Sequence, residues 1–214
     1  MPKVSAAHRQ ARRQQILDAA VACVARQGFH RTTMQDIVRE AGLSPGAIYG
    51  YFASKEAIID AIGADRHALE TALIAAARSA GDVPQVLRRL AREFLAMLRD
   101  PVERRRRRVA VQIWAEALRN PRLLRQVRGG VDRPRALLAD LIRAGQARGD
   151  VSAAVAPDAA ARVMIALFQG FILQQAWDPR VAVPPYLSAL EAVIDGLTGA
   201  AGRQPARPRK RAQR

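Results

Sequence analysis

The 214-residue chain carries 35 lysine and arginine residues against 19 aspartate and glutamate residues, so its formal net charge is +16. Half of its residues are hydrophobic, which is typical of a globular protein and excludes a mainly disordered chain. The one cysteine, Cys23, excludes an intramolecular disulfide and a cysteine-based zinc site.

No segment of the sequence is typical of secretion or of a membrane span. The N-terminus is polar and lacks the apolar core of a signal peptide. The longest apolar stretch, residues 163–173, is much shorter than the roughly 20 residues that a spanning helix needs. We therefore expect a soluble, cytoplasmic protein, and its basic charge points to a polyanionic partner.

The positive charge is concentrated in three segments. Residues 1–55 contain eight basic and three acidic side chains, residues 101–150 contain 13 and five, and residues 203–214 contain six and none. The last segment is expected to be a disordered tail that adds sequence-independent affinity. The N-terminal arm (Lys3, Arg9, Arg12, Arg13) either contacts DNA or is a solvated helix face. The run Arg104–Arg108 is either a solvated face or lies beside an anionic neighbour.

The sequence predicts an all-α fold of about nine helices. Alanine, leucine and arginine favour helix, and apolar residues recur every three or four positions. No alternating β-branched run and no Asn-Gly or Asp-Gly hairpin signal predicts a strand. The helices are expected at about residues 7–27, 34–41, 45–52, 54 to beyond 73, 83–98, 109–118, 121–148, 157–177 and 184–197, with strain near Gly129, Gly130 and Pro134.

Two short helices joined by a tight turn carry the first functional signal. Thr33, with Asp36 three positions later, is a capping box that begins a helix, and Gly42 ends it. Ser44 followed by Pro45 then predicts the start of the next helix. This spacing is that of a helix-turn-helix, whose second helix presents its N-terminal end to a major groove.

A specific pattern extends from residue 16 to residue 59. It comprises Ile16–Ala20, Gly28-Phe29, Thr32-Thr33, Ile37, Glu40–Ser44, Gly46–Tyr49, Tyr51-Phe52 and Ser54–Glu56. On these residues the segment resembles the DNA-binding region of the TetR family of bacterial transcriptional repressors. The resemblance implies a dimer on a palindromic DNA site, from which a small molecule releases it. No cofactor and no metal motif is expected.

The resemblance also implies which residues contact DNA. These are Thr33, Gln35, Pro45, Gly46, Ala47, Tyr49, Gly50, Tyr51 and Lys55. The hydroxyl and ammonium groups would bind phosphates, residues 45–47 would face the bases, and Gln35 would reach either. Gly50 stands where family members usually carry an aromatic residue or histidine, so direct base readout is expected to be sparse.

The rest of the chain resembles the family's ligand-binding region, in particular the subgroup of choline-responsive repressors, at Ile113–Glu116, Arg148–Asp150 and Ala166–Phe171. The resemblance implies an effector pocket lined by Phe94, Met97, Gln112, Trp114, Leu118, Met164, Phe168 and Phe171. Gln169 and Gln174 are alternative polar contacts. The alternative interpretation of each of these residues is an ordinary residue of the hydrophobic core that contacts no ligand. The last two helices would pair with those of a second subunit.

We expect three parts: a helix-turn-helix domain with its basic arm (1–53), an effector-binding and dimerisation domain (54–200), and the basic tail (201–214). Two other function classes remain as alternatives. Residues 42–46 match the Gly-x-Ser-x-Gly pattern of an esterase, although that pattern requires a preceding strand. A non-specific architectural DNA-binding protein would bind through the arm and tail, with a steep dependence on salt.

Overall fold

The computed structural model describes residues 5–77 and 81–198, so Lys3 and the basic tail lie outside the described residues. The described residues form nine α-helices and no strand, which confirms the all-α prediction. The helices are α1 (Ala6–Gln27), α2 (Met34–Ala41), α3 (Pro45–Tyr49), α4 (Lys55–Ala77), α5 (Val83–Met97), α6 (Pro101–Ala117), α7 (Pro121–Arg148), α8 (Pro157–Trp177) and α9 (Val183–Thr198).

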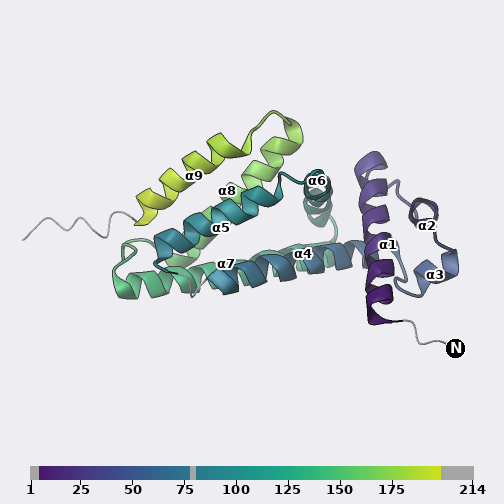
Figure 1. Cartoon of the computed structure of the whole chain (residues 1–214), viewed down its shortest axis with the longest axis horizontal. Coiled ribbons are helices and arrows are strands. Elements are labelled where there is room, and N and C mark those ends of the chain that lie inside the picture. The colour runs from purple at the N-terminus through teal and green to yellow at the C-terminus, as the bar shows by residue number, and fades with distance from the viewer. Residues whose placement is uncertain (1–4, 78–80, 199–214) are drawn as a thin grey trace, which may run out of the picture.

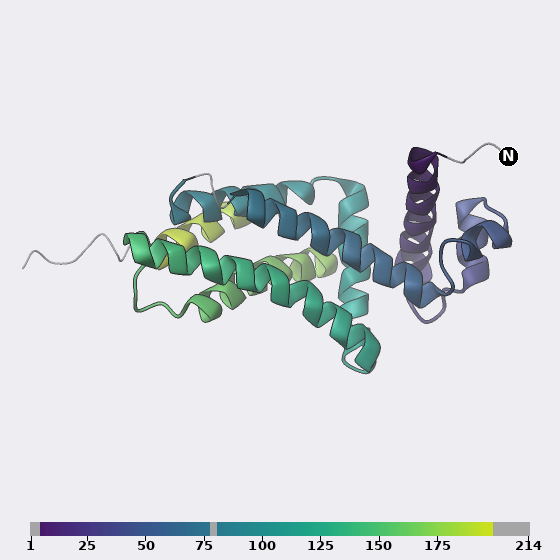
Figure 2. The same ribbon diagram turned by 90° about the horizontal axis from the view of Figure 1, so that it is seen from below.

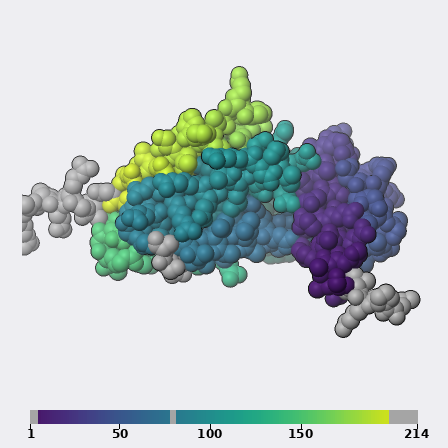
Figure 3. Space-filling view, in the orientation of Figure 1, coloured from purple at the N-terminus to yellow at the C-terminus, as the bar shows by residue number. Residues whose placement is uncertain are grey.

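The helices form two unequal groups. Helices α1, α2 and α3 lie at one end of the molecule, and α5, α7, α8 and α9 form a larger body at the other (Figure 1). Helix α4 leaves the α1–α3 end and runs beside α7 along the larger body, while α6 lies crosswise between that body and α1 (Figure 2). Helices α8 and α9 cover one outer side of the larger body (Figure 3).

Three clusters of buried side chains hold these groups together. The N-terminal cluster consists of Ile16, Leu17, Ala19, Ala20, Cys23, Ile37, Ala41, Ile48, Phe52 and Ile58. A junction cluster consists of Val21, Val24, Phe29, Ile59, Val109, Ala117 and Leu123. The largest cluster joins α4, α5, α7, α8 and α9. Since Ile58 and Ile59 of α4 belong to different clusters, the first turns of α4 link the helix-turn-helix to the larger body.

The sixth helix begins earlier than the sequence predicts. It starts at Pro101 rather than near Val109, because the Asp100 side chain accepts a hydrogen bond from the Val102 N–H (2.9 Å) and proline suits the first helical position. The run Arg104–Arg108 therefore lies within the helix. Two of its five arginines, Arg106 and Arg107, have acidic partners, which are described below.

The seventh helix is continuous from Pro121 to Arg148, without the break that the glycine pair and proline suggest. Gly130 is buried, and the imidazole of His67 on α4 occupies the space where a Cβ at this position would lie. Pro134 is also buried inside the helix. Close packing of α4 against α7 therefore stabilises a helix whose local sequence favours interruption.

Candidate DNA-binding site and effector cavity

Helix α2 and the turn after it form as the local sequence predicts. The Thr33 hydroxyl accepts from the Asp36 N–H (3.1 Å), and the Asp36 carboxylate accepts from the Thr33 N–H (3.0 Å), which completes the capping box. Gly42 takes a left-handed conformation (φ 63°) that costs little without a side chain. Ser44 Oγ then accepts from the Ala47 N–H (3.2 Å) and begins α3.

Helix α3 is anchored by one residue and exposes the others. Ile48 is fully buried in the N-terminal cluster. Pro45, Gly46 and Ala47, which the family resemblance places against the bases, are exposed. A Cβ at Gly46 would meet no atom of this chain within 4 Å, so packing within the chain does not require glycine there.

The two tyrosines of this region also face outward. Tyr49 has 54% of its surface exposed and Tyr51 has 36%. Neither phenol has a hydrogen-bond partner in the described part of the chain. Both side chains are therefore available to a partner outside the chain, and Gly50 between them is exposed as well.

The side chains of Thr33 and Gln35 differ in whether another residue of the chain already binds them. The Thr33 hydroxyl donates to the Asp36 carboxylate (2.8 Å), and together with the Thr33 N–H it lowers the pKa of Asp36. A DNA phosphate at Thr33 would have to compete with that carboxylate. The Gln35 side chain is exposed, and nothing in residues 5–77 or 81–198 binds it.

Lys55 has a position within the chain that the sequence did not reveal. Its ammonium donates to the Phe29 carbonyl oxygen (2.8 Å) and lies 4.4 Å from the centre of the Phe29 ring. These contacts join the start of α4 to the α1–α2 loop. An ammonium group has three N–H donors, so two remain for a phosphate.

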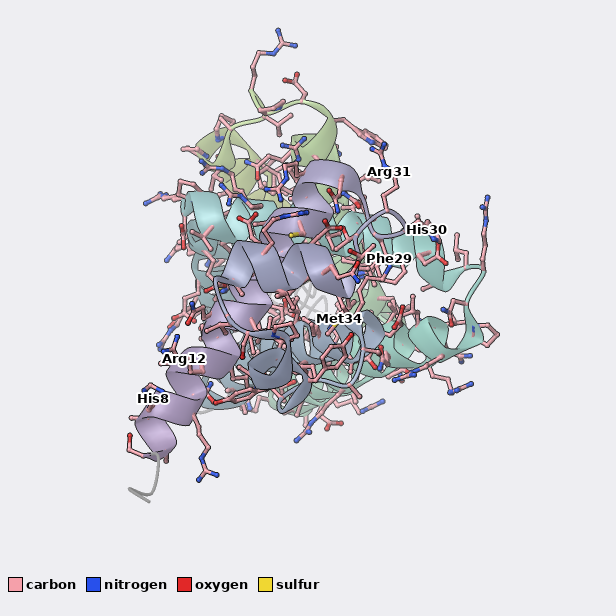
Figure 4. The ribbon with its side chains drawn as sticks, turned by 90° about the vertical axis from the view of Figure 1, so that its right-hand side faces the viewer. His8, Arg12, Phe29, His30, Arg31 and Met34 are labelled. Carbon is pink, nitrogen blue, oxygen red and sulfur yellow. The ribbon has the colours of Figure 1, made fainter. Side chains whose placement is uncertain are left out.

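Some side chains of the basic N-terminal arm bind other residues of the chain. Arg13 forms a bidentate pair with Asp65 of α4, with Nη2 to Oδ1 at 2.9 Å. Arg12 bonds Gln15, and Arg9 is exposed. In the view toward the α1–α3 end, His8 and Arg12 project from the first turns of α1, far from His30 and Arg31 (Figure 4). Arg9 and Arg12 remain candidates for DNA contact.

A cavity of about 890 Å³ lies among α4, α6, α7 and α8. Three of the predicted effector-pocket residues, Phe94, Trp114 and Phe168, line it, together with Gln169. The rings of Phe94 and Phe168 are 5.4 Å apart. The cavity wall thus combines aromatic and aliphatic side chains with many polar and charged groups.

Other predicted pocket residues lie outside this cavity. Leu118 is 82% exposed just after the end of α6 and does not line the cavity. Phe171 is fully buried in the core against Tyr186, and Met164 packs against the same core. Gln112 lines a different cleft. Neither Met97 nor Gln174 lines the cavity.

Four buried charged residues at the cavity were missed by sequence reasoning. Glu70 Oε1 accepts from Arg66 (3.0 Å) and from Arg107 (2.9 Å), and Glu103 Oε1 accepts from Arg66 (2.8 Å) and Arg107 (3.1 Å). The Arg107 guanidinium also lies 5.1 Å from the centre of the Phe168 ring. The i,i+4 spacing of Arg66–Glu70 and of Glu103–Arg107 was the available signal. Nothing in the sequence indicates that the two pairs meet.

Burial shifts the pKa of two groups beside the cavity. Desolvation, with a smaller contribution from the charge of Glu103, raises the pKa of Glu70, although the Arg66 guanidinium favours the charged form of Glu70. Burial, together with the charge of Arg66, lowers the pKa of His67. No cluster of three or more acidic, histidine or cysteine side chains suited to a metal ion occurs in residues 5–77 and 81–198.

These features define a helix-turn-helix protein with an internal cavity, and the comparisons with known proteins agree. Residues 16–62 match the family model described as "Bacterial regulatory proteins, tetR family". Residues 84–186 match that of the "BetI-type transcriptional repressor, C-terminal". The chain belongs to the TetR family of bacterial transcriptional regulators.

Two curated relatives match over different lengths. YfiR of Bacillus subtilis, an uncharacterised regulator, is 47% identical over 55 residues, which are 26% of this chain and only 27% of YfiR. UidR of Escherichia coli K12, a helix-turn-helix transcriptional regulator, is 25% identical over 187 residues, which are 86% of this chain and 92% of UidR. Identity is therefore higher over the short match with YfiR than over the long match with UidR.

Two solved structures share the whole architecture. GusR of Salmonella enterica has a TM-score of 0.73 and 28% identity, covering 88% of this chain and 96% of GusR. A transcriptional regulator from Saccharomonospora viridis in complex with choline has a TM-score of 0.72 and 27% identity, covering 87% of this chain and 96% of that one.

Proposed function

We propose that the protein is a sequence-specific transcriptional repressor that binds a palindromic operator as a dimer and is released by a small molecule. The observation that carries the DNA-binding part is the surface of α3. Buried Ile48 fixes this short helix, while Pro45–Ala47 and Tyr49 stand exposed with no partner in the described chain. Two such helices about one DNA turn apart (~34 Å) would read the two halves of a palindrome.

The proposed contact between Tyr49 and a phosphate can be tested by removing only the hydroxyl group of Tyr49. Tyr49→Phe keeps the ring and removes the donor, so we expect about tenfold weaker binding to specific and non-specific DNA alike, since the contact carries no sequence information. Arg89→Gln removes an exposed charge of α5, outside the helix-turn-helix, and serves as the control. Fluorescence anisotropy on both DNAs measures the effect. Unchanged affinity of Tyr49→Phe contradicts the contact.

Lys55 is proposed to bind phosphate as well as Phe29. Lys55→Ala would weaken DNA binding, but it also removes the bond to the Phe29 carbonyl. Thermal unfolding must therefore accompany the binding measurement. A loss of DNA affinity at a temperature where the variant is fully folded supports the contact. Equal affinity of the folded variant and the wild type contradicts it.

Dimerisation is proposed through α8 and α9. Helix α8 is long and apolar enough to cross a membrane by length and composition, contrary to the expectation from the sequence, yet only 22% of that stretch is buried within the chain. Val163 of α8 and Val193 of α9 are 46% and 42% exposed. Such incompletely buried apolar helices suit an isologous interface, so we place a second copy of this chain on them.

Substitution of both valines tests this interface. Val163→Asp with Val193→Asp would place two charges in it, and we expect a folded monomer in sedimentation velocity at micromolar concentration. Leu118→Asp, at an apolar residue that is 82% exposed just after the end of α6, is the matched control and should leave the dimer intact. A double variant that remains dimeric would contradict the proposed interface.

The effector is proposed to occupy the 890 Å³ cavity. Phe94, Trp114 and Phe168 supply aromatic surface there, and the Glu70–Arg107 pair supplies polar contacts. One structural neighbour holds choline, which supports a small molecule without identifying it. A ligand that favours a conformation with wrongly spaced α3 helices must weaken DNA binding, typically by about 5- to 150-fold.

The proposed division into residues 1–53, 54–200 and 201–214 assigns DNA binding to the first part and effector binding with dimerisation to the second. A cytoplasmic, non-enzymatic role goes with it, and relatives named as transcriptional regulators support it. Ser44, the centre of the esterase-like pattern, follows a helix and caps α3 instead of following a strand. A non-specific architectural DNA-binding protein would bind DNA without any preference for its sequence.

A further inference from the structure

A second cleft, of about 950 Å³, lies at the junction of α1, α6 and the α8–α9 turn. It shares only Arg107 and Ile172 with the proposed effector cavity. Its lining includes seven arginines, which are Arg26, Arg99, Arg104, Arg105, Arg107, Arg108 and Arg180, against one acidic residue, Glu40. A concave surface lined by one sign of charge concentrates the electrostatic potential.

Three of these arginines are neutralised within the chain. Arg26 pairs with Glu40 at 2.9 Å. Arg180 pairs with Asp178 at 2.9 Å. Arg107 is held by the buried carboxylates beside the effector cavity. These three do not require an external anion.

The other four keep their charge. Arg104 Nη1 donates to the carbonyl oxygens of Leu98 (3.0 Å) and Arg99 (2.8 Å), which orient the guanidinium without neutralising it. The side chains of Arg99, Arg105 and Arg108 are exposed and form no hydrogen bond or ion pair within residues 5–77 and 81–198. Four like charges at one cleft repel one another unless an anion lies between them.

We propose that this cleft binds a small phosphorylated compound with two or more phosphate charges. Guanidinium groups bind phosphate oxygens in pairs of parallel hydrogen bonds, which favours phosphate over other anions. The volume is that of an ordinary small-molecule site. DNA could supply the same phosphates, but no residue of α3 lines the cleft, so the ligand is a free compound.

The position of the cleft gives the ligand a regulatory role. Its walls come from Arg26 of α1 and Glu40 of α2 on one side, and from Arg105 and Arg108 of α6 on the other. Figure 1 shows α6 between α1 and the larger body. A bound polyanion would therefore join the helix-turn-helix to α6 and change DNA affinity by linkage. Only this regulatory consequence rests on the proposed function.

Sodium tripolyphosphate is a suitable probe, titrated calorimetrically into the full chain at constant ionic strength. The test variant is Arg105→Gln with Arg108→Gln. The control, Arg125→Gln with Arg128→Gln, removes two exposed charges of α7 at the same spacing. The six basic residues of 203–214 are present in both, so their contribution cancels. We expect at least about tenfold weaker binding in the test variant and less than twofold change in the control.

A site-resolved measurement accompanies the titration. Phenylglyoxal modifies exposed arginines, and mass spectrometry of the peptides should show that tripolyphosphate protects Arg105 and Arg108 but not Arg125 and Arg128. No binding by the wild type, equal losses in both variants, or equal protection of both pairs would overturn the proposal. So would a selective loss of DNA affinity in the test variant without any loss of tripolyphosphate binding, because the cleft would then serve DNA.

Discussion

Arg107 of α6 donates from Nη2 to Oε1 of Glu70 on α4 across 2.9 Å, and both side chains are largely buried beside the cavity. The next residue toward the N-terminus, Arg106, bonds Asp18 of α1 at 2.6 Å. Adjacent residues of one helix thus contact the cavity wall and the helix-turn-helix end. A ligand that disturbs Arg107 would act on α6 at the point where α6 contacts α1.

The two arginines are predicted to differ in their effect on stability. Arg107→Met leaves Glu70 and Glu103 buried with one fewer partner, so the free energy of unfolding should fall by about 3–5 kcal/mol. Arg106→Met breaks a partly exposed pair and should cost at most about 1 kcal/mol. Urea unfolding followed by circular dichroism measures both. Equal costs would show that the Arg107 cluster is not an energetically distinct buried network.

Thr33 is predicted to act first as a helix cap. Thr33→Ala removes the hydroxyl that accepts from the Asp36 N–H and should lower the free energy of unfolding by about 1 kcal/mol. Thr33→Ser keeps the hydroxyl and should be close to wild type in both stability and DNA affinity. A stable Thr33→Ala variant with weakened DNA binding would instead assign the hydroxyl to a phosphate.

Two glycines of α7 are predicted to respond in opposite directions to alanine. A Cβ at Gly145 would lie 2.6 Å from a methyl of Val83 and 2.9 Å from one of Val151, so Gly145→Ala should destabilise by about 1–3 kcal/mol. Gly129 has nothing within 4 Å of such a Cβ, so Gly129→Ala should stabilise by about 0.5–1 kcal/mol. Thermal unfolding of both variants gives the comparison. Stabilisation by both changes would contradict the packing of α7 against Val83.

His67 is predicted to make stability depend on pH. Its folded-state pKa is lowered by burial and by Arg66. The unfolded chain therefore takes up a proton as pH falls through about 6.5, and the folded chain does so only at lower pH. The free energy of unfolding should then fall between about pH 7.5 and 5.5.

The matched variants for this prediction are His67→Gln and His8→Gln. Loss of the titrating group at position 67 should reduce the pH dependence of the free energy of unfolding over that interval. His8 lies on the exposed first turn of α1, and its replacement should leave the dependence unchanged. An identical pH dependence in all three proteins would show that His67 is not held in its neutral form.

Local signals made the helix-turn-helix predictable. Thr33, Gly42 and Ser44 act within four residues of their own positions, so their caps and turn could be predicted without knowledge of the fold. The contact between α4 and α6 could not, because Glu70 and Arg107 lie 37 positions apart. The family resemblance implied Leu118 in the pocket, but a resemblance does not reveal that α6 ends at Ala117 and leaves Leu118 exposed.

Selection of bound genomic fragments by the purified full-length protein tests the central claim most directly. At physiological salt, a sequence-specific repressor should enrich one palindromic motif and bind it about 10³-fold or more tightly than random DNA of the same length. Tyr49→Phe should lower binding to both DNAs without changing the motif. The claim would be contradicted if the bound fragments shared no palindrome and if the DNA affinity depended on salt concentration but not on DNA sequence.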